Sequence, residues 1–136
     1  MIFLDTNAVI AVMNDAPRRV ADVLAERLAA REQIVISSIV LFELWFGIAK
    51  STRKSGNAEK LGDILSAPIQ QLAFDSEDAL VAGKVRQELA LKGTPIGPYD
   101  VLIAGQALRR GATLVTANSK EFKRVRGLKC EDWTKR

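Results

Sequence analysis

Three carboxylates stand at positions in this chain where an acidic side chain is unusual. Asp5 directly follows a short apolar run, Glu43 interrupts a longer apolar run, and Asp100 follows Gly97-Pro98-Tyr99. In open α/β sheets, ligands bind in the crevice beyond the carboxyl ends of the parallel strands, which is where Asp5 is expected. Three acids gathered from distant parts of one small chain therefore predict a magnesium site.

A magnesium site of this kind supports phosphodiester chemistry. Mg²⁺ prefers oxygen ligands and keeps several waters, so one or two direct carboxylates are enough to hold it. Such a cluster can activate a water for attack on phosphorus. The chain contains no histidine and a single cysteine, Cys130. This composition excludes Ser-His-Asp and Cys-His catalysis, the common zinc sites and an intrachain disulfide.

Each acid also has an ordinary structural explanation. Asp5 can cap the helix that follows it, although Thr6 or Asn7 could do so equally well. Glu43 needs either a Lys or Arg partner or a metal, because a buried unpaired carboxylate is costly. Asp100 lies in a first helical turn, where the helix dipole favours an anion by about 0.3–1 kcal/mol. The joint pattern, in which each acid follows a strand or opens a helix, favours the metal site.

A fourth polar residue, Asn118, follows an apolar run in the same way and should face the same crevice. Glu121 stands three residues further on, so the two residues also resemble a capping box. Two hypotheses for Asn118 therefore stay open. It is either a helix cap or an active-site residue that acts through a bound water.

The elements that must position these residues follow from hydrophobic periodicity. Strands are expected at residues 2–4, 34–37, 68–74, 112–116 and 129–133. Helices are expected at residues 18–31, 38–50, 58–65, 76–92, 98–110 and 118–124. Ser38 is expected to cap the second helix, and the polar stretch 51–57 is expected to be a flexible connection. Apolar strands that alternate with helices predict an α/β fold with a mostly parallel sheet covered on both faces.

Length and composition predict one ordinary globular domain over residues 1–136. Hydrophobic residues make up 48% and charged residues 26% of the chain, as is typical of soluble proteins. The longest apolar run, residues 34–42, is too short to span a bilayer, and the N-terminus has no secretory signal. We therefore expect a cytoplasmic location without membrane association. Neither a Rossmann fingerprint nor a Walker A loop occurs.

The excess of positive charge lies at one end of the chain. Twenty Lys and Arg against sixteen Asp and Glu give a net charge of +4. Residues 120–136 hold seven of these cations against three acids, so the rest of the chain is balanced. A basic end on a neutral body fits a polyanionic partner such as nucleic acid, and it equally fits a solvated tail.

Four motifs in this order resemble PIN-domain ribonucleases, in particular the VapC-type toxins of toxin–antitoxin pairs. The motifs are Asp5-Thr6-Asn7, Ser37-Ser38 followed by Glu43, Pro98-Tyr99-Asp100-Val101-Leu102-Ile103-Ala104, and the segment from Thr113 to Phe122. The resemblance covers almost the whole chain. It implies a three-layer α/β/α fold, RNA cleavage that depends on Mg²⁺ or Mn²⁺, a homodimer, and a cognate antitoxin that inserts a segment into the acidic cleft.

The resemblance also implies roles for individual residues. Asp5, Glu43 and Asp100 match the family's acidic cluster, with Asp5 and Asp100 as direct metal ligands. Asn118 stands where the family often has Asp, so a second metal ion would lack a charged ligand, although an amide can still orient a water. Polar neighbours that could support the ligands are Thr6, Asn7 and Thr116, and residues that could hold RNA phosphates are Lys50, Arg53, Lys54 and Lys120.

The helix that carries Glu43 is apolar on nearly every side, through Phe42, Trp45, Phe46 and Ile48. It is therefore either buried in the core or used in a dimer or antitoxin interface.

Two other functions remain open. One is a catalytically weak PIN module that binds RNA or protein, because Asn118 is uncharged. The other is a phosphatase or receiver-type domain with Asp5 as phosphoryl acceptor, although Thr6 and Asn7 stand where a second acid would be expected.

Overall fold

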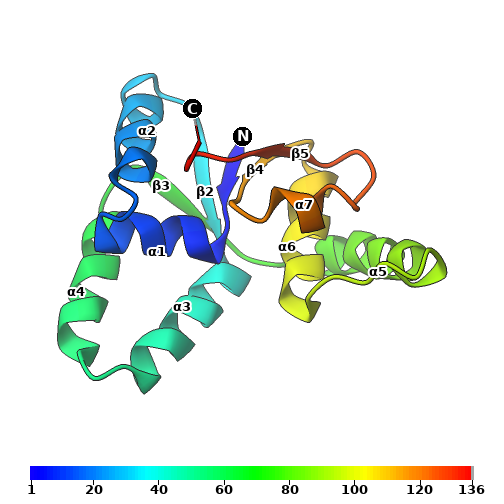
Figure 1. Ribbon diagram of the computed structural model, residues 1–136, viewed down its shortest axis with the longest axis horizontal. Coiled ribbons are helices and arrows are strands. Elements are labelled where there is room, and N and C mark those ends of the chain that lie inside the picture. Colours follow the sequence, from blue (N-terminus) through cyan, green and yellow to red (C-terminus); the bar gives the residue numbers. More distant parts are fainter. Residues whose placement is uncertain (136) are drawn as a thin grey trace.

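Five parallel strands form the centre of the molecule. The computed structural model describes residues 1–135, and the sheet has the strand order β3-β2-β1-β4-β5 (Figure 1). The strands are β1 (Ile2–Leu4), β2 (Ile34–Ser37), β3 (Ile69–Leu72), β4 (Thr113–Val115) and β5 (Lys129–Glu131). Every pairing is parallel. The predicted α/β fold with a parallel central sheet is confirmed.

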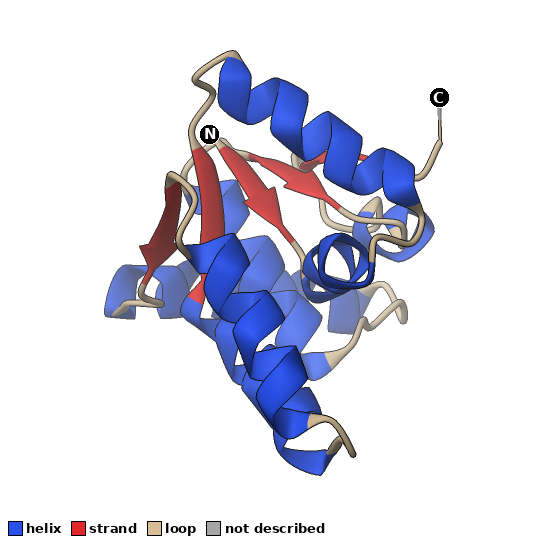
Figure 2. Cartoon of the chain, turned by 90° about the vertical axis from the view of Figure 1, so that its left-hand side faces the viewer, coloured by secondary structure: helices blue, strands red, loops and turns tan. Residues whose placement is uncertain are grey.

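Helices connect the strands and cover both faces of the sheet (Figure 2). They are α1 (Thr6–Asn14), α2 (Arg18–Ala29), α3 (Ser38–Lys50), α4 (Lys54–Leu65), α5 (Ser76–Leu91), α6 (Pro98–Arg109) and α7 (Ser119–Phe122). In Figure 1, α1, α2 and α4 lie to one side of the strands, while α5 and α6 lie to the other. This is the three-layer α/β/α arrangement that the sequence predicts.

The strand order places a switch point between β1 and β4. From β1 the chain moves outward to β2 and β3, then returns across the sheet to β4 and β5. Right-handed crossovers put the connecting helices of the two halves on opposite faces, so a crevice opens where the order reverses. Asp5 follows β1 at this point, and its backbone N–H donates to the carbonyl of Val115 at the end of β4 (3.1 Å). The topology therefore brings the ends of β1 and β4 together.

The strands are held by burial on both faces, as an all-parallel sheet requires. Phe3, Val35 and Leu114 come from three adjacent strands and are fully buried. Within residues 1–135, no helix is both long and apolar enough to cross a bilayer.

One predicted helix cap and one predicted helix boundary are wrong. Helix α1, for which the sequence analysis gives no bounds, begins directly after Asp5. The cap of α3 is Ser37, whose side chain accepts a hydrogen bond from Ile39 N (3.0 Å), and Ser38 instead accepts one from Phe74 N (3.0 Å). Helix α4 begins at Lys54, four residues earlier than predicted, because packing of its apolar face outweighs the low helix propensity of its first turn.

Helices α5 and α6 form a closely packed pair that positions the start of α6. A capping box joins Asp75 and Asp78 at the start of α5 (2.9 Å in each direction). Asp78 is fully buried and pairs with Arg109 and Arg110 at the end of α6. Although burial raises the pKa of Asp78, hydrogen bonds from these arginines bring it below the usual range. A buried acid that serves structure thus has two cationic partners.

The closest approach of α5 and α6 occurs at Gly105. A Cβ at this position would lie 2.6 Å from the Cα of Ala82 and 2.7 Å from its Cβ. We therefore expect Gly105→Ala to push the helices apart and to lower the free energy of unfolding by about 1–3 kcal/mol. Chemical denaturation monitored by circular dichroism measures this change.

The matched control is Gly83→Ala, in the middle of α5, where a Cβ meets nothing within 4 Å. Since Ala loses less backbone entropy in a helix than Gly, this variant should be more stable by about 0.5–1 kcal/mol. Equal stability of the two variants would contradict the packing described for Gly105.

Candidate active site

Asp5 lies at the carboxyl end of β1 and is 94% removed from solvent, with 6% of its surface exposed. Its Oδ1 accepts a hydrogen bond from Ala8 N (2.8 Å), so Asp5 caps α1 and neither Thr6 nor Asn7 takes that role. Burial raises the pKa of Asp5, and the Thr116 side chain and Ala8 N–H lower it only in part. The negative charges of nearby acids raise the pKa further. Asp5 is therefore both a helix cap and a poorly solvated carboxylate.

Glu43 reaches the same place from α3. It is half-buried, and its Oε1 accepts a hydrogen bond from the Thr6 hydroxyl (2.8 Å). Its charge is among the causes that raise the pKa of Asp5. The sequence analysis left two partners open for Glu43, a Lys or Arg side chain or a metal. Within residues 1–135, Glu43 forms no ion pair. A neutral hydroxyl orients this carboxylate and leaves its charge uncompensated.

Asp100 stands in the first turn of α6, after Gly97 at the helix cap and Pro98. Burial raises its pKa from 3.8 to about 6, with contributions from the charges of Glu121, Glu43 and Asp5, in that order. Such coupling requires these carboxylates to lie near one another. Asp5, Glu43 and Asp100 therefore lie close enough for their charges to interact, at the switch point of the sheet.

Glu121 on α7 is a fourth acid that the sequence analysis placed only as a possible cap partner. Its Oε1 accepts a hydrogen bond from Gly97 N (2.9 Å) and its Oε2 one from the Asn118 side-chain amide (2.6 Å). These two bonds lower the pKa of Glu121 and keep it ionised, and the bond from Asn118 has the larger effect. The sequence signal was its position three residues after Asn118, in the first turn of α7, just beyond the end of β4.

Asn118 does not form a capping box, which was one of the two hypotheses for this residue. No side-chain cap bond is made at the start of α7, and Asn118 instead donates to the Glu121 carboxylate. Its backbone N–H donates to the hydroxyl of Thr116 (2.9 Å), which is buried beside Asp5. Asn118 and Thr116 thus link two acids of the site, Glu121 and Asp5, through neutral groups.

The remaining polar residues differ in how closely they approach the acids. Thr6 and Thr116 contact Glu43 and Asp5 as described, whereas Asn7 is exposed on α1. Asn7 shares a small hollow with Thr116 and Asp132, whose charge also raises the pKa of Asp5.

The site is acidic, and although the charge of Arg124 helps to lower the pKa of Glu121, no cation in the described part of the chain is paired with the acids. Within residues 1–135, no Lys or Arg forms an ion pair with any of the four acids of the cluster, Asp5, Glu43, Asp100 and Glu121. In the same part of the chain, no three acidic or cysteine side chains are grouped closely enough to hold a metal ion by themselves. Mg²⁺ keeps several of its waters and needs only one or two direct carboxylates. An all-oxygen, electronegative, partly desolvated cluster therefore fits this ion.

The residues predicted to hold RNA phosphates lie in three different places on the surface. Lys50 and Glu43 line one groove, which Phe42, Phe46 and Tyr99 also line, and the Lys50 ammonium lies 4.9 Å from the ring centre of Phe46. Arg53 and Lys54 line a separate open hollow formed by residues 51–56. Lys120 is exposed on α7, next to Glu121. Arg136, part of the predicted basic end, lies outside the described residues.

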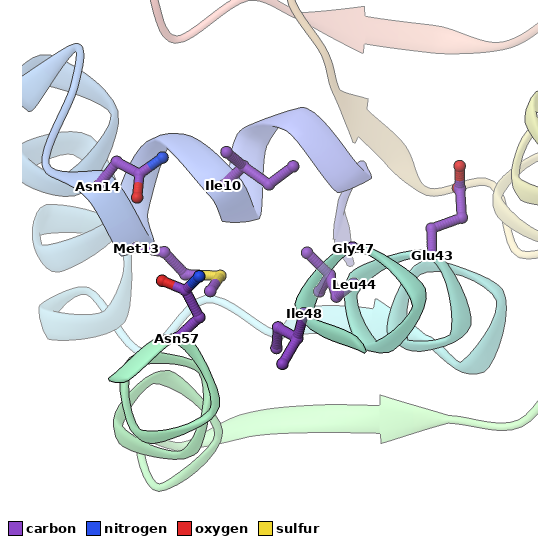
Figure 3. Close-up of a pocket in the computed structure, with 8 residues that line it drawn as sticks. All are labelled: Ile10, Met13, Asn14, Glu43, Leu44, Gly47, Ile48 and Asn57. Carbon is purple, nitrogen blue, oxygen red and sulfur yellow. The ribbon is translucent and has the colours of Figure 1, made fainter. Parts of the chain in front are cut away.

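A second groove begins beside Glu43 and runs between α1, α3 and α4. Its cavity of about 190 Å³ is lined mainly by apolar side chains (Figure 3), namely those of Ile10, Met13, Leu44 and Ile48, with Asn14, Asn57, Gly47 and Glu43. In Figure 3, Glu43 projects from α3 at one end of this groove, and Asn14 and Asn57 lie at the other. A mainly apolar groove thus lies next to Glu43, one acid of the cluster.

Comparisons with known proteins agree with this geometry. The family model for the PIN domain matches residues 2–128. A protein of Salmonella typhimurium named tRNA(fMet)-specific endonuclease VapC is 40% identical over 131 residues, which cover 96% of each chain. Ribonuclease VapC2 of Rickettsia felis is 43% identical over 132 residues, which cover 97% of each.

Solved structures give the same result. The structure of VapBC2 from Rickettsia felis bound to a DNA fragment from their promoter matches with a TM-score of 0.90 and 42% identity, over 98% of this chain and 99% of that chain. DNA-bound VapBC from Salmonella typhimurium matches with a TM-score of 0.88 and 38% identity, over 97% of both chains. The chain therefore belongs to the PIN-domain family, among the VapC ribonucleases.

Proposed function

We propose that this protein is a magnesium-dependent endoribonuclease, the toxin of a toxin–antitoxin pair, that hydrolyses RNA phosphodiesters at its acid cluster. The observation that carries the proposal is the convergence of Asp5, Glu43, Asp100 and Glu121 without a cationic partner among the described residues. Mn²⁺ can replace it, since Mn²⁺ also accepts oxygen ligands. Relatives named as ribonucleases share more than nine-tenths of the chain's length.

Asp5 and Asp100 would hold the ion directly, because both are poorly solvated carboxylates at the switch point. When bound, Mg²⁺ supplies the positive charge that activates a water and offsets charge developing on the phosphate. Thr6 fixes Oε1 of Glu43 (2.8 Å), which leaves Oε2 to accept a proton from the attacking water. Asn118 holds Glu121 in place (2.6 Å), so that the charge of this carboxylate stays near Asp100.

An alternative is a module that binds RNA or protein but cleaves weakly, because Asn118 is uncharged. Glu121 argues against that alternative, because it is a fourth carboxylate whose charge raises the pKa of Asp100. Cleavage assays separate the two functions. The first substrate to test is tRNA(fMet), after the name of the Salmonella relative.

The proposed partner is a separate antitoxin chain that fills the apolar groove of Figure 3 and reaches the acid cluster from it. Solved relatives are VapBC complexes, which supports such a partner. We further propose a homodimer and a cytoplasmic location, where cellular RNA is present. A small neighbouring reading frame whose product copurifies with this protein would identify the antitoxin.

We expect Asp5→Asn and Asp100→Asn each to slow RNA cleavage by at least about 100-fold, because each removes a charged ligand from the site. Folding should be kept, since Asn can also cap a helix. The control is Asp63→Asn on the exposed side of α4, which should cleave at the wild-type rate. Wild-type cleavage by the two cluster variants, in preparations free of contaminating nuclease, would refute the assignment.

Asp100→Asn should also stabilise the protein when metal is removed with EDTA. Because the folded-state pKa of Asp100 is about 6 rather than 3.8, its ionised form destabilises the fold above pH 6, by about 1–3 kcal/mol. The difference should shrink as the pH falls from 6 and vanish below about pH 4, where both states bind the proton. Melting temperatures at pH 4.0 and 7.5 measure it.

Added Mg²⁺ should then reverse the order of the melting temperatures at pH 7.5, so that the wild type melts above Asp100→Asn. Binding to the folded state raises the melting temperature of the wild type and of Asp63→Asn, but not of Asp100→Asn. An Asp100→Asn protein that melts below the wild type in EDTA would show that this carboxylate is not destabilised by its neighbours.

A further inference from the structure

A row of exposed aromatic side chains lies beside the acid cluster. Phe42, Phe46 and Tyr99 have 53%, 60% and 44% of their surface exposed. They line a groove of about 450 Å³ together with Thr6, Ile10, Glu43, Gly47 and Lys50. The sequence analysis left open whether the helix of Glu43 is core or interface. Helix α3 buries one side in the core and leaves the other side exposed. Large aromatic surface left in water typically marks a binding site.

Two of these rings come from distant parts of the chain and meet next to the acids. The ring centres of Phe42 and Tyr99 are 5.5 Å apart, with a tilt of 58° between the ring planes. Phe42 directly precedes Glu43, and Tyr99 directly precedes Asp100. The ring pair therefore adjoins the site where a phosphodiester would be cleaved.

Charge along the groove changes from one end to the other. Glu43 stands at the acid end, and Lys50 lies two helical turns further along α3, a rise of about 10 Å. The Lys50 ammonium lies over the ring of Phe46, 4.9 Å from its centre. Between the acid and the cation the groove wall is uncharged and aromatic. An RNA strand offers a matching sequence of groups, with a phosphate on either side of an uncharged base.

We propose that Phe42 and Tyr99 form a stacking site for an unpaired base beside the cleaved phosphodiester, and that Lys50 contacts the next phosphate. The inference rests on the proposed nuclease function. Bases stack on exposed aromatic side chains with little dependence on sequence. Only unpaired segments can turn a base outward in this way. The site thus makes the enzyme selective for single-stranded or looped RNA.

The chain supplies its own control for this proposal. Trp45 lies on the same helix and is similarly exposed (48%), but it does not line the groove. If only a second copy of the chain or an antitoxin used this surface, substitutions of Trp45 and Phe42 would affect RNA binding equally. A base-stacking site requires them to differ.

The experiment compares Phe42→Leu and Tyr99→Leu with Trp45→Leu, using a single-stranded oligoribonucleotide that the wild type cleaves. Loss of one stacking ring should raise KM about 10-fold with little change in kcat, because stacking binds substrate and transition state alike. Trp45→Leu should keep the wild-type KM. Phe42→Tyr, which retains a ring, should stay near the wild type. The same oligonucleotide annealed to its complement should be a poor substrate.

A second measurement needs no change in the protein. Substrates with one abasic nucleotide, placed at each position in turn, should raise KM about 10-fold at a single position next to the cleaved bond. At that position Tyr99→Leu should cause little further increase, because base and ring form one contact. This scan decides the question even if a variant of α3 folds poorly.

The outcomes separate the two proposals. A wild type that cleaves RNA, with unchanged KM in Phe42→Leu and Tyr99→Leu and no sensitive abasic position, would overturn the stacking site and leave the nuclease function standing. Variants that lose only dimer formation or antitoxin binding would overturn it as well, and would assign the rings to a protein partner. A wild type that cleaves no RNA would overturn the nuclease function itself.

Discussion

Mutual repulsion among carboxylates is the constraint on which the site depends. Burial and the charges of Glu121, Glu43 and Asp5 raise the pKa of Asp100 to about 6. The same protein shows the alternative arrangement at Asp78, which is buried but paired with Arg109 and Arg110 and has a lowered pKa. One acid is neutralised to stabilise the fold, while the cluster is left electronegative, as a cation-binding site requires.

Neutral donors hold the cluster in place without cancelling its charge. Ala8 N–H fixes Asp5, the Thr6 hydroxyl fixes Glu43, and Gly97 N–H with Asn118 fixes Glu121. Each donor lies at the start of a helix next to the sheet edge, and the bond from Ala8 N–H to Asp5 is also the cap of α1. The rigid pair of α5 and α6 sets the position of Asp100 from the other side of the molecule.

Much of this could be predicted from the sequence. The alternation of apolar strands and helices fixes a parallel sheet, and acids that follow strands must meet at its carboxyl edge. Glu121 was missed as a site residue because its spacing from Asn118 also fits a capping box, and only the tertiary contact with Gly97 N distinguishes the two. The sequence left open whether the helix that carries Phe42 is core or interface, and it gave no sign that Tyr99 on α6 is exposed beside it.

The most direct measurement is anomalous diffraction from crystals of the protein soaked in Mn²⁺. We predict one strong peak between the carboxylates of Asp5 and Asp100, with waters joining the ion to Glu43 and Glu121. No peak at this edge of the sheet, or a peak only at surface acids such as Asp75 and Glu77, would contradict the assignment of the cluster as a metal centre.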